Sequence, residues 1–251
     1  MRRSFSYLLA SMLVVGATFS QSVLGQEQVK VQKVYHPPEP YTAELKITRV
    51  QTLANGTTIT HVTKQTRARD AQGRSVFIEA KLSEDGQETH SSTDVDDPVA
   101  GTHTTWNAVQ KKATVVHHPP PDQRSGCWQA PDGYRESSTS VGISAMRVER
   151  PKPVREDLGY TTIQGVQAHG MRTTYLTPAG AAGNDQPLTR VIEDWNAPSL
   201  GLQVRRLVDD PRTGKLDQEL VSLTRGEPDS ALFQIPEGYE IVNQEMVPCK
   251  E

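Results

Sequence analysis

The sequence is poor in aromatic residues and in apolar residues generally. Phe, Trp and Tyr make up 6% of its 251 residues, and hydrophobic residues make up 35%. A chain of this length suits one large β domain or two small ones, but it has little material for a thick core. We therefore expect a thin core, or one that is shared with a ligand or partner.

Runs of basic residues are also missing. Arg205-Arg206 and Lys111-Lys112 are isolated pairs, as is typical of a solvated strand face. If residues 1–25 are removed, 27 basic residues become 25 against 30 acidic residues, a net charge of −5. This balance disfavours polyanions, and we expect no nucleic acid partner.

Motifs for nucleophilic, nucleotide-dependent or metal-dependent chemistry are absent. Gly142-Ile-Ser144 lacks the second glycine of a nucleophile elbow, and Gly180-Ala-Ala-Gly183 is followed by residues that cannot open a phosphate-binding helix. Of the seven histidines, His117 and His118 are adjacent and point to opposite faces of a strand. We predict no cofactor, no metal site and no enzymatic activity.

The N-terminus has the pattern of a secretory signal. Arg2 and Arg3 precede an apolar run over residues 7–19, and small residues follow up to Gly25. Thirteen residues of helix span about 20 Å, which is less than the roughly 30 Å of membrane hydrocarbon. We predict cleavage after Gly25, a periplasmic or secreted protein and no stable membrane anchor, with general or twin-arginine export both open.

Cys127 and Cys249 are the two cysteines of the chain. In an oxidising compartment a disulfide between them is the natural hypothesis, and it would stabilise the fold by roughly 4 to 5 kcal/mol in the chain-entropy model. Unpaired or intermolecular thiols remain the alternative. Metal ligation is not expected, because neither cysteine has a second cysteine or a histidine at a suitable spacing.

Most of the remaining chain alternates apolar and polar residues with the period of a β-strand. Residues 41–48 alternate strictly, and Asn55-Gly56 predicts a hairpin turn into a returning strand over residues 57–69. A further turn at residues 70–73 predicts a three-stranded antiparallel meander. We expect a signal peptide over residues 1–25, an extended leader over 26–40 and one β domain over 41–247, with a Pro-rich irregular insertion at 119–155.

The stretch that contains Glu193, Asp194 and Trp195 is predicted to be a strand rather than a site. Consecutive carboxylates point to opposite faces of a strand, so Glu193 and Asp194 cannot form an acid–base pair by themselves. Glu79 or Asp209 would have to supply a partner across the sheet. Cross-strand pairing with Arg190, Arg205 or Arg206 is the simpler expectation.

Three short motifs occur in a familiar order. They are Leu158-Gly159 with Ile163 and Gly165-Val166, then Glu193-Asp194-Trp195, then Phe233 to Tyr239. With the signal and the meander, this order resembles uncharacterised secreted bacterial proteins related to the outer-membrane lipoprotein carrier-like fold. The resemblance implies a mainly β fold with few short helices, in which a strongly curved antiparallel sheet forms an incomplete barrel with an apolar concave side. In the carriers that hollow holds acyl chains, but this chain has few aromatic residues and no convincing covering helices.

We therefore predict a non-enzymatic protein that binds a lipid, an acylated or peptide ligand, or an envelope protein on the concave face of the sheet. An open hollow leaves inward aliphatic side chains without partners of their own. A carboxylate-dependent hydrolase and a structural protein of the cell envelope remain the alternatives. The expected ligand-contacting residues are Leu45, Ile47, Ile59, Ile78 and Trp195.

Overall fold

The computed structural model describes residues 38–83, 85–120, 128–129 and 151–249. The chain divides into two units, residues 1–36 and 37–251, and only the second contains described residues. The predicted signal peptide and its cleavage site therefore lie outside the described residues, as does the leader up to residue 37.

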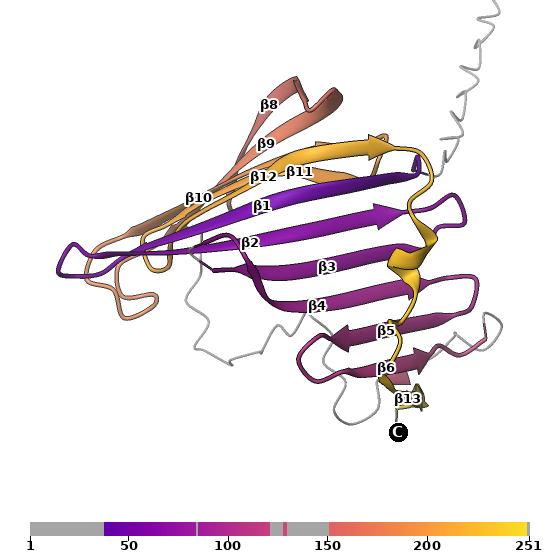
Figure 1. The fold of residues 1–251 in the computed structure, drawn as a ribbon. Helices are drawn as coiled ribbons and strands as arrows, with labels where there is room; N and C mark the ends of the chain where they lie inside the picture. Colours follow the sequence, from indigo (N-terminus) through magenta and orange to yellow (C-terminus); the bar gives the residue numbers. More distant parts are fainter. Residues whose placement is uncertain (1–37, 84, 121–127, 130–150, 250–251) are drawn as a thin grey trace, which may run out of the picture. The chain divides into compact units, whose positions relative to one another are not determined.

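Among the described residues, twelve strands form one sheet (Figure 1). Its order is β13-β6-β5-β4-β3-β2-β1-β12-β11-β10-β9-β8, and every pairing is antiparallel except that of β13 with β6. The strands are β1 (Tyr41–Thr52), β2 (Thr58–Arg69), β3 (Ser75–Leu82), β4 (Glu88–Asp97), β5 (Thr102–Asn107), β6 (Lys112–His117), β8 (Val154–Ile163), β9 (Val166–Thr177), β10 (Leu188–Ala197), β11 (Leu202–Asp210), β12 (Gly214–Arg225) and β13 (Glu240–Glu245).

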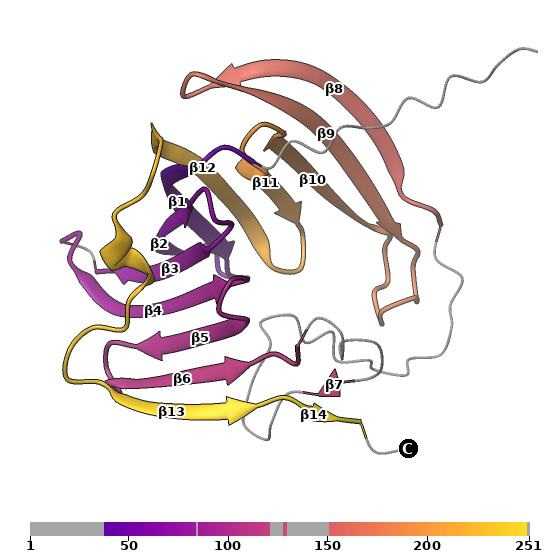
Figure 2. The same cartoon turned by 90° about the vertical axis from the view of Figure 1, so that its right-hand side faces the viewer.

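The sheet is strongly curved and does not close. Its outer strands β13 and β8 are not paired with each other, and Figure 2 shows the sheet bending from one to the other around an open side. The short 3-10 helix η2 (Ser230–Phe233) is the helical element of the described residues. The predicted fold class, a mainly β incomplete barrel with little helix, is confirmed.

Turn chemistry fixes the register of the strands. Gly56 has a φ of +83°, and the backbone N–H of Thr57 donates to the Asn55 side chain at 3.0 Å, so the predicted Asn-Gly turn joins β1 to β2. Gly214 lets β12 start close to β1, because a Cβ on that residue would lie 2.2 Å from the carbonyl oxygen of Val50.

Most of the predicted insertion at 119–155 lies outside the described residues. Within it, β7 (Trp128–Gln129) pairs with β14 (Val247–Pro248) as a separate two-stranded sheet. At the other end of the insertion β8 already begins at Val154.

The first apolar cluster lies where the start of β1 meets β12, β11 and β9. Leu45 and Val204 are fully buried in it, and so is Leu200 from the turn between β10 and β11. Backbone pairing between Glu39 and Ser199 fastens the segment before β1 to this turn. This cluster anchors the centre of the sheet to its β8–β11 part.

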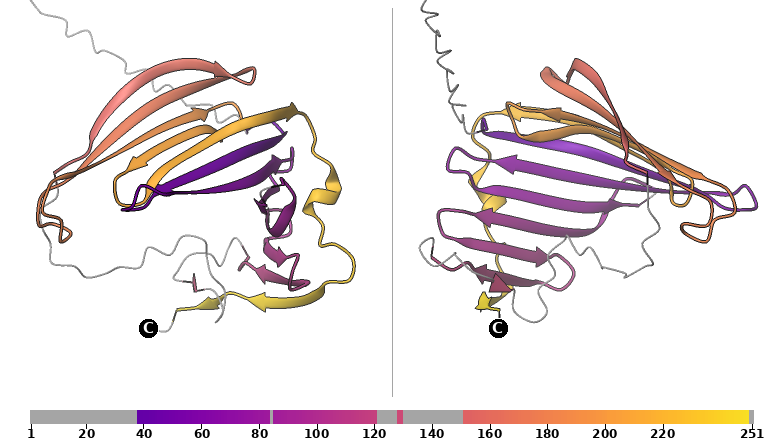
Figure 3. Two further views of the ribbon diagram at one scale, coloured as in Figure 1. Left: turned by 60° about the vertical axis from the view of Figure 1, so that its left-hand side comes forward. Right: turned by 180° about the vertical axis from the view of Figure 1, so that it is seen from behind.

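The second apolar cluster lies on the opposite face of β2–β6. Ala68 and Val76 are directly opposite each other there, next to Val95, and the half-buried Phe233 of η2 packs against the cluster. Figure 3 shows that the segment with η2 lies on the outer side of the curved sheet, opposite its open side. We call this the convex face, and the face that carries Leu45 and the side chains opposite it the concave face.

Candidate ligand-binding face

The concave face of β2–β5 is polar. Because side chains alternate and the register runs without a break through the relevant pairs, residues on this face form rows across the sheet. One row runs through Tyr41, Arg69, Ser75, Asp96 and His103, and the next through Ala43, Arg67, Phe77, Asp94 and Thr105.

Two arginines project from β2 into this face. The guanidinium of Arg67 lies 5.4 Å from the centre of the Phe77 ring, and its Nη2 donates to Gln65 Oε1 at 3.0 Å. The Nε of Arg67 is buried without a hydrogen-bond partner. Burial lowers the pKa of Arg67, and neither Arg67 nor Arg69 forms an ion pair with a described carboxylate. Both guanidiniums therefore keep hydrogen-bonding capacity.

Two aspartates lie on β4, two strands away from the arginines. Asp96 Oδ1 is 2.6 Å from His103 Nδ1, and Asp94 Oδ1 is 3.8 Å from His103 Nε2. The hydrogen bond to His103 lowers the pKa of Asp96, whereas burial raises the pKa of Asp94. Both carboxylates lie next to the same imidazole, and their pKa values are shifted in opposite directions.

Tyr41 lies beside the arginines at the end of the first row. Its side chain is 6% exposed, and burial raises its pKa although the charges of Arg69 and Arg67 act in the opposite direction. A cavity of about 220 Å³ is lined by Tyr41, both arginines, Phe77 and the two aspartates. The polar groups of four strands thus converge on one space.

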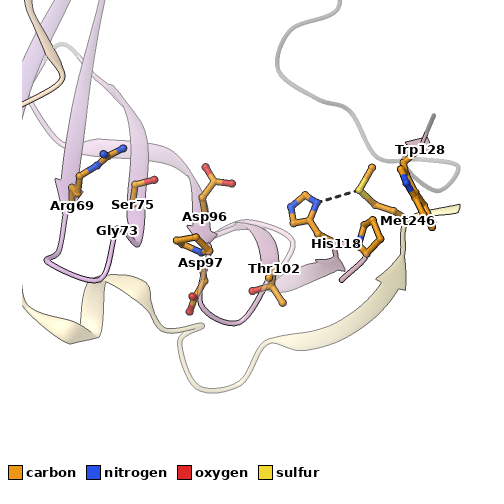
Figure 4. A pocket seen from close by; sticks show the side chains of 12 residues that line it. Arg69, Gly73, Ser75, Asp96, Asp97, Thr102, His118, Trp128 and Met246 are labelled. Carbon is orange, nitrogen blue, oxygen red and sulfur yellow. Dashed lines mark hydrogen bonds between the residues drawn. The ribbon is translucent and has the colours of Figure 1, made fainter. Parts of the chain in front are cut away.

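A second cavity of about 520 Å³ adjoins the first one, because Arg69, Ser75 and Asp96 line both. Figure 4 shows this second cavity, with His118 and Met246 on its far side. The His118 Nδ1 atom lies 3.2 Å from the Met246 sulfur. Trp128 of β7 contributes the aromatic part of the lining.

A third cavity, of about 850 Å³, lies toward the other end of β2 and β3. Its lining includes Arg49, His61, Glu79 and Lys81 together with the edge of Ile47. Glu79 accepts a hydrogen bond from Gln65 Nε2 at 2.8 Å. The accessible part of the concave face therefore carries charged groups along the length of β2 and β3, mixed with apolar side chains.

Of the five residues expected to contact a ligand, Leu45, Ile47 and Ile59 lie on the concave face, and Ile47 lines the third cavity. Leu45 and Ile47 are 0% and 4% exposed and belong to the interior, whereas Ile59, 37% exposed, lies near the far end of β2. Ile78 is opposite Thr66, which is opposite Glu44, so it lies on the convex face. Contact between a ligand and these five residues stays a prediction.

Trp195 has a packing role in the structure. It is half-buried against the first apolar cluster, and a Cβ on Gly170 would lie 2.6 Å from its ring. The glycine opposite it makes room for the indole. The apolar residues singled out in the sequence mostly build the interior, because a thin sheet needs them there.

The acidic stretch in β10 behaves as a salt-bridged strand. Asp194 lies opposite Arg206, with Arg206 Nη1 3.5 Å from Asp194 Oδ1, as one of the expected cross-strand pairs. Glu193 instead pairs with Arg172 at 2.7 Å. Glu193 and Asp209 both line a cavity of about 540 Å³, and Asp209 pairs there with Lys215 at 3.3 Å, whereas Glu79 accepts its hydrogen bond from Gln65.

The arginine and aspartate rows were missed in the sequence. The signal was present, since the Asn-Gly turn fixes the β1–β2 register and places Arg67 opposite Ala43. The pairing of β3 with β4 then decides which acids face the arginines. That second register depends on the turn around Gly86 and on an irregularity at Lys81/Leu82, which the sequence does not define.

Within the described residues, no group of three His, Cys, Asp or Glu side chains has the arrangement of a metal site. The same residues contain no helix of the length and hydropathy needed to span a membrane. Cys127 lies outside the described residues, so its pairing with Cys249 stays a prediction.

Fold and face together define an open, curved β-sheet protein with a polar concave side. No family model and no curated protein matches this chain. Among solved structures it is similar to an uncharacterized conserved protein from Thermus thermophilus, at 10% identity and a TM-score of 0.39, with 82% of this chain and 91% of that chain covered.

Two further solved structures are similar to this chain. One is MucB in complex with MucA(peri), at 12% identity and a TM-score of 0.41, covering 81% of this chain and 57% of that one. The other is a LolA superfamily protein from Nitrosomonas europaea, at 8% identity and a TM-score of 0.30, covering 79% and 91%. The LolA superfamily has the carrier-like fold that the sequence motifs resemble. The likeness concerns the fold alone and assigns no function.

Proposed function

We propose that this chain is a non-enzymatic, extracytoplasmic protein that holds a ligand or a partner segment against the concave face of its open sheet. The observation that carries the proposal is the line of adjoining cavities on that face, with arginines that have no ion-pair partner among the described residues. In this proposal residues 41–247 are the binding domain, and the signal-like residues 1–25 direct it out of the cytoplasm.

The lining of the cavities favours an amphipathic ligand over a bare acyl chain. A purely apolar ligand would remove guanidinium and carboxylate groups from water without replacing their hydrogen bonds, which is costly. An acylated molecule with a charged end, or a peptide segment, would use both the polar rows and the aromatic groups Phe77 and Trp128.

Lipid extraction and mass spectrometry of the full-length protein from its own envelope provide the test, with a variant that fills the site. Ser75 lines two of the cavities, so Ser75→Trp is expected to remove a co-purifying molecule. Thr161→Trp on the exposed edge strand β8 is the matched control. Equal occupancy in both variants, or a wild-type protein that carries nothing and retains no added amphiphile or peptide, would reject the proposal.

One observation favours the hydrolase alternative. Asp94 and Asp96 face the same cavity with opposite pKa shifts, which is the arrangement that separates a general acid from a general base. Turnover of ester or glycoside substrates that Asp94→Asn abolishes, while binding persists, would favour this function over a binding role.

A further inference from the structure

We infer that Arg67, Arg69 and the Tyr41 hydroxyl form a subsite for an oxyanion, a phosphate or carboxylate group, carried by the ligand. The inference rests on the proposed function and names the chemistry of one end of the ligand. It starts from the Arg67 guanidinium, which lines the cavity and whose Nε is buried without a hydrogen-bond partner.

Arg67 is incompletely satisfied within its own protein. Its described hydrogen bond goes from Nη2 to an amide oxygen, and its ring contact with Phe77 supplies no acceptor in the plane of the guanidinium. A guanidinium presents five N–H donors in a planar fork that matches the oxygens of a carboxylate or phosphate. An oxyanion in the adjoining cavity would supply the missing acceptors.

Arg69 supports the same position from two residues along β2. It points to the same face as Arg67, lines two of the cavities and makes no ion pair with a described residue. Most other arginines of the sheet are engaged: Arg172 with Glu156 and Glu193, and Arg206 with Asp194. Two adjacent arginines without acids are an exception in this molecule.

The charge of Glu79 acts on Arg67, but neither Glu79 nor another described acid forms an ion pair with Arg67 or Arg69. Asp96 is occupied by His103, and Asp94 lies two strands from Arg67, with Phe77 between them. Strands are spaced about 4.8 Å apart, so the two Cα atoms lie roughly 10 Å from each other. Burial also raises the pKa of Asp94, which weakens its charge as pH falls. An anion next to β2 would therefore meet two guanidiniums that have no ion-paired carboxylate among the described residues.

Calorimetric titration of the full-length protein with matched amphiphiles tests the inference. The probes are dodecyl phosphate, dodecanoate, uncharged dodecyl maltoside and inorganic phosphate, each below its micelle concentration where it has one. The variants are Arg67→Gln and Arg69→Gln, with Arg155→Gln as control, because Arg155 is exposed on β8 and its removal changes the net charge equally.

We expect an anionic amphiphile to bind at least tenfold more tightly than dodecyl maltoside, and each site variant to remove most of that preference while Arg155→Gln keeps it. The more tightly bound of the two anions identifies a phosphate or a carboxylate end. Binding of inorganic phosphate with the same arginine dependence also supports the subsite, and assigns it to a free anion.

Equal affinity for charged and uncharged amphiphiles, or full retention of the preference in both site variants, overturns the inference and leaves the proposed function standing. Failure of all four probes to bind also overturns it, and the Ser75→Trp test then decides the proposed function separately. Thermal unfolding of Arg67→Gln distinguishes loss of the subsite from loss of fold, because replacing a buried unpaired guanidinium is not expected to lower the melting temperature.

Discussion

The two faces of strands β2–β6 are built from the same strands by alternate residues, yet they differ in almost every respect. The convex face presents Val76, Val95 and Trp106, and the segment with Leu232 and Phe233 packs on it. The concave face presents arginines, aspartates and a histidine around cavities. One face is completed by the chain itself, and the other offers polar groups to something else.

The convex face of β2–β6 is the face that stabilises the sheet. Apolar burial contributes about 25 cal/mol per Å², so a face with a large covered apolar area stabilises the sheet. Charged groups in cavities contribute little to stability, and a buried unpaired one costs free energy. A sheet with so few apolar residues can afford only one well-packed face in this region.

The largest expected effect lies in the convex cluster. Trp106 is 8% exposed and packs in this cluster, so Trp106→Ala removes a large buried ring and leaves a cavity. We expect the free energy of unfolding to fall by about 3 to 5 kcal/mol, measured by urea denaturation. A loss below about 1 kcal/mol would mean that the convex face is not where the stability resides.

The covering segment is the second way to test the comparison. Phe233 is half-buried against the convex cluster and lies 4.8 Å from the Arg74 guanidinium. Phe233→Ala is expected to cost about 1.5 to 3 kcal/mol by the same measurement, because part of the ring is already in water. The exposed Leu176 of β9 provides the control, and Leu176→Ala should change the unfolding free energy by less than about 0.5 kcal/mol.

The sequence predicted the fold better than the site, and particular residues show why. Alternation from Tyr41 to Ile47 and the Asn55-Gly56 turn are local signals, and both led to the correct strands. Which face is concave is not a local property. It depends on the sum of twist and bulges across twelve strands, including the irregularities at Glu44/Leu45 and Trp195/Asn196.

Ile78 is an example of a residue whose face in the sheet could not be predicted from the local sequence. Its apolar side chain and its strand were recognised, but its register with Thr66 sends it to the convex side. The resemblance to a carrier-like fold implies an apolar concave side. In this chain Val76, Ile78 and Val95 of β3 and β4 pack on the convex face, whereas Phe77 lines the concave cavity with arginines and acids.

Arg172 and Arg67 differ in whether they form an ion pair within the protein. Arg172 bonds Glu193 and Glu156 at 2.7 Å, whereas Arg67 has no ion pair with a described acid. Arg172→Met is expected to lower the midpoint of urea denaturation slightly, because the network is exposed to solvent. Arg67→Met should be neutral or stabilising in the same assay. The reverse order would mean that Arg67 serves the fold rather than a ligand.

The smallest expected effect is a pH dependence that distinguishes the two aspartates of the concave face. The pKa of Asp96 is held below its ordinary value of 3.8 by the His103 hydrogen bond, so its contribution is present above that value and is lost as pH falls through the folded pKa. Burial raises the pKa of Asp94, so its ionised form destabilises the folded state at neutral pH and this penalty disappears on acidification. Asp96→Asn should therefore lower stability at pH 7, and Asp94→Asn should leave it equal or slightly higher.

Both aspartates are more than a third exposed, so we expect each difference to stay below about 1 kcal/mol. Urea denaturation at pH 7 and at pH 3 measures them. Both should shrink at the lower pH, because protonation of Asp94 removes its penalty and protonation of the Asp96 carboxyl in the unfolded state removes part of its contribution. Asp96→Asn is read together with His103→Gln, which removes the same hydrogen bond from the other side. A double variant no less stable than either single variant would show that the bond between them carries the effect. If Asp94→Asn and Asp96→Asn changed stability in the same direction, the opposite pKa shifts of these two carboxyl groups would be contradicted.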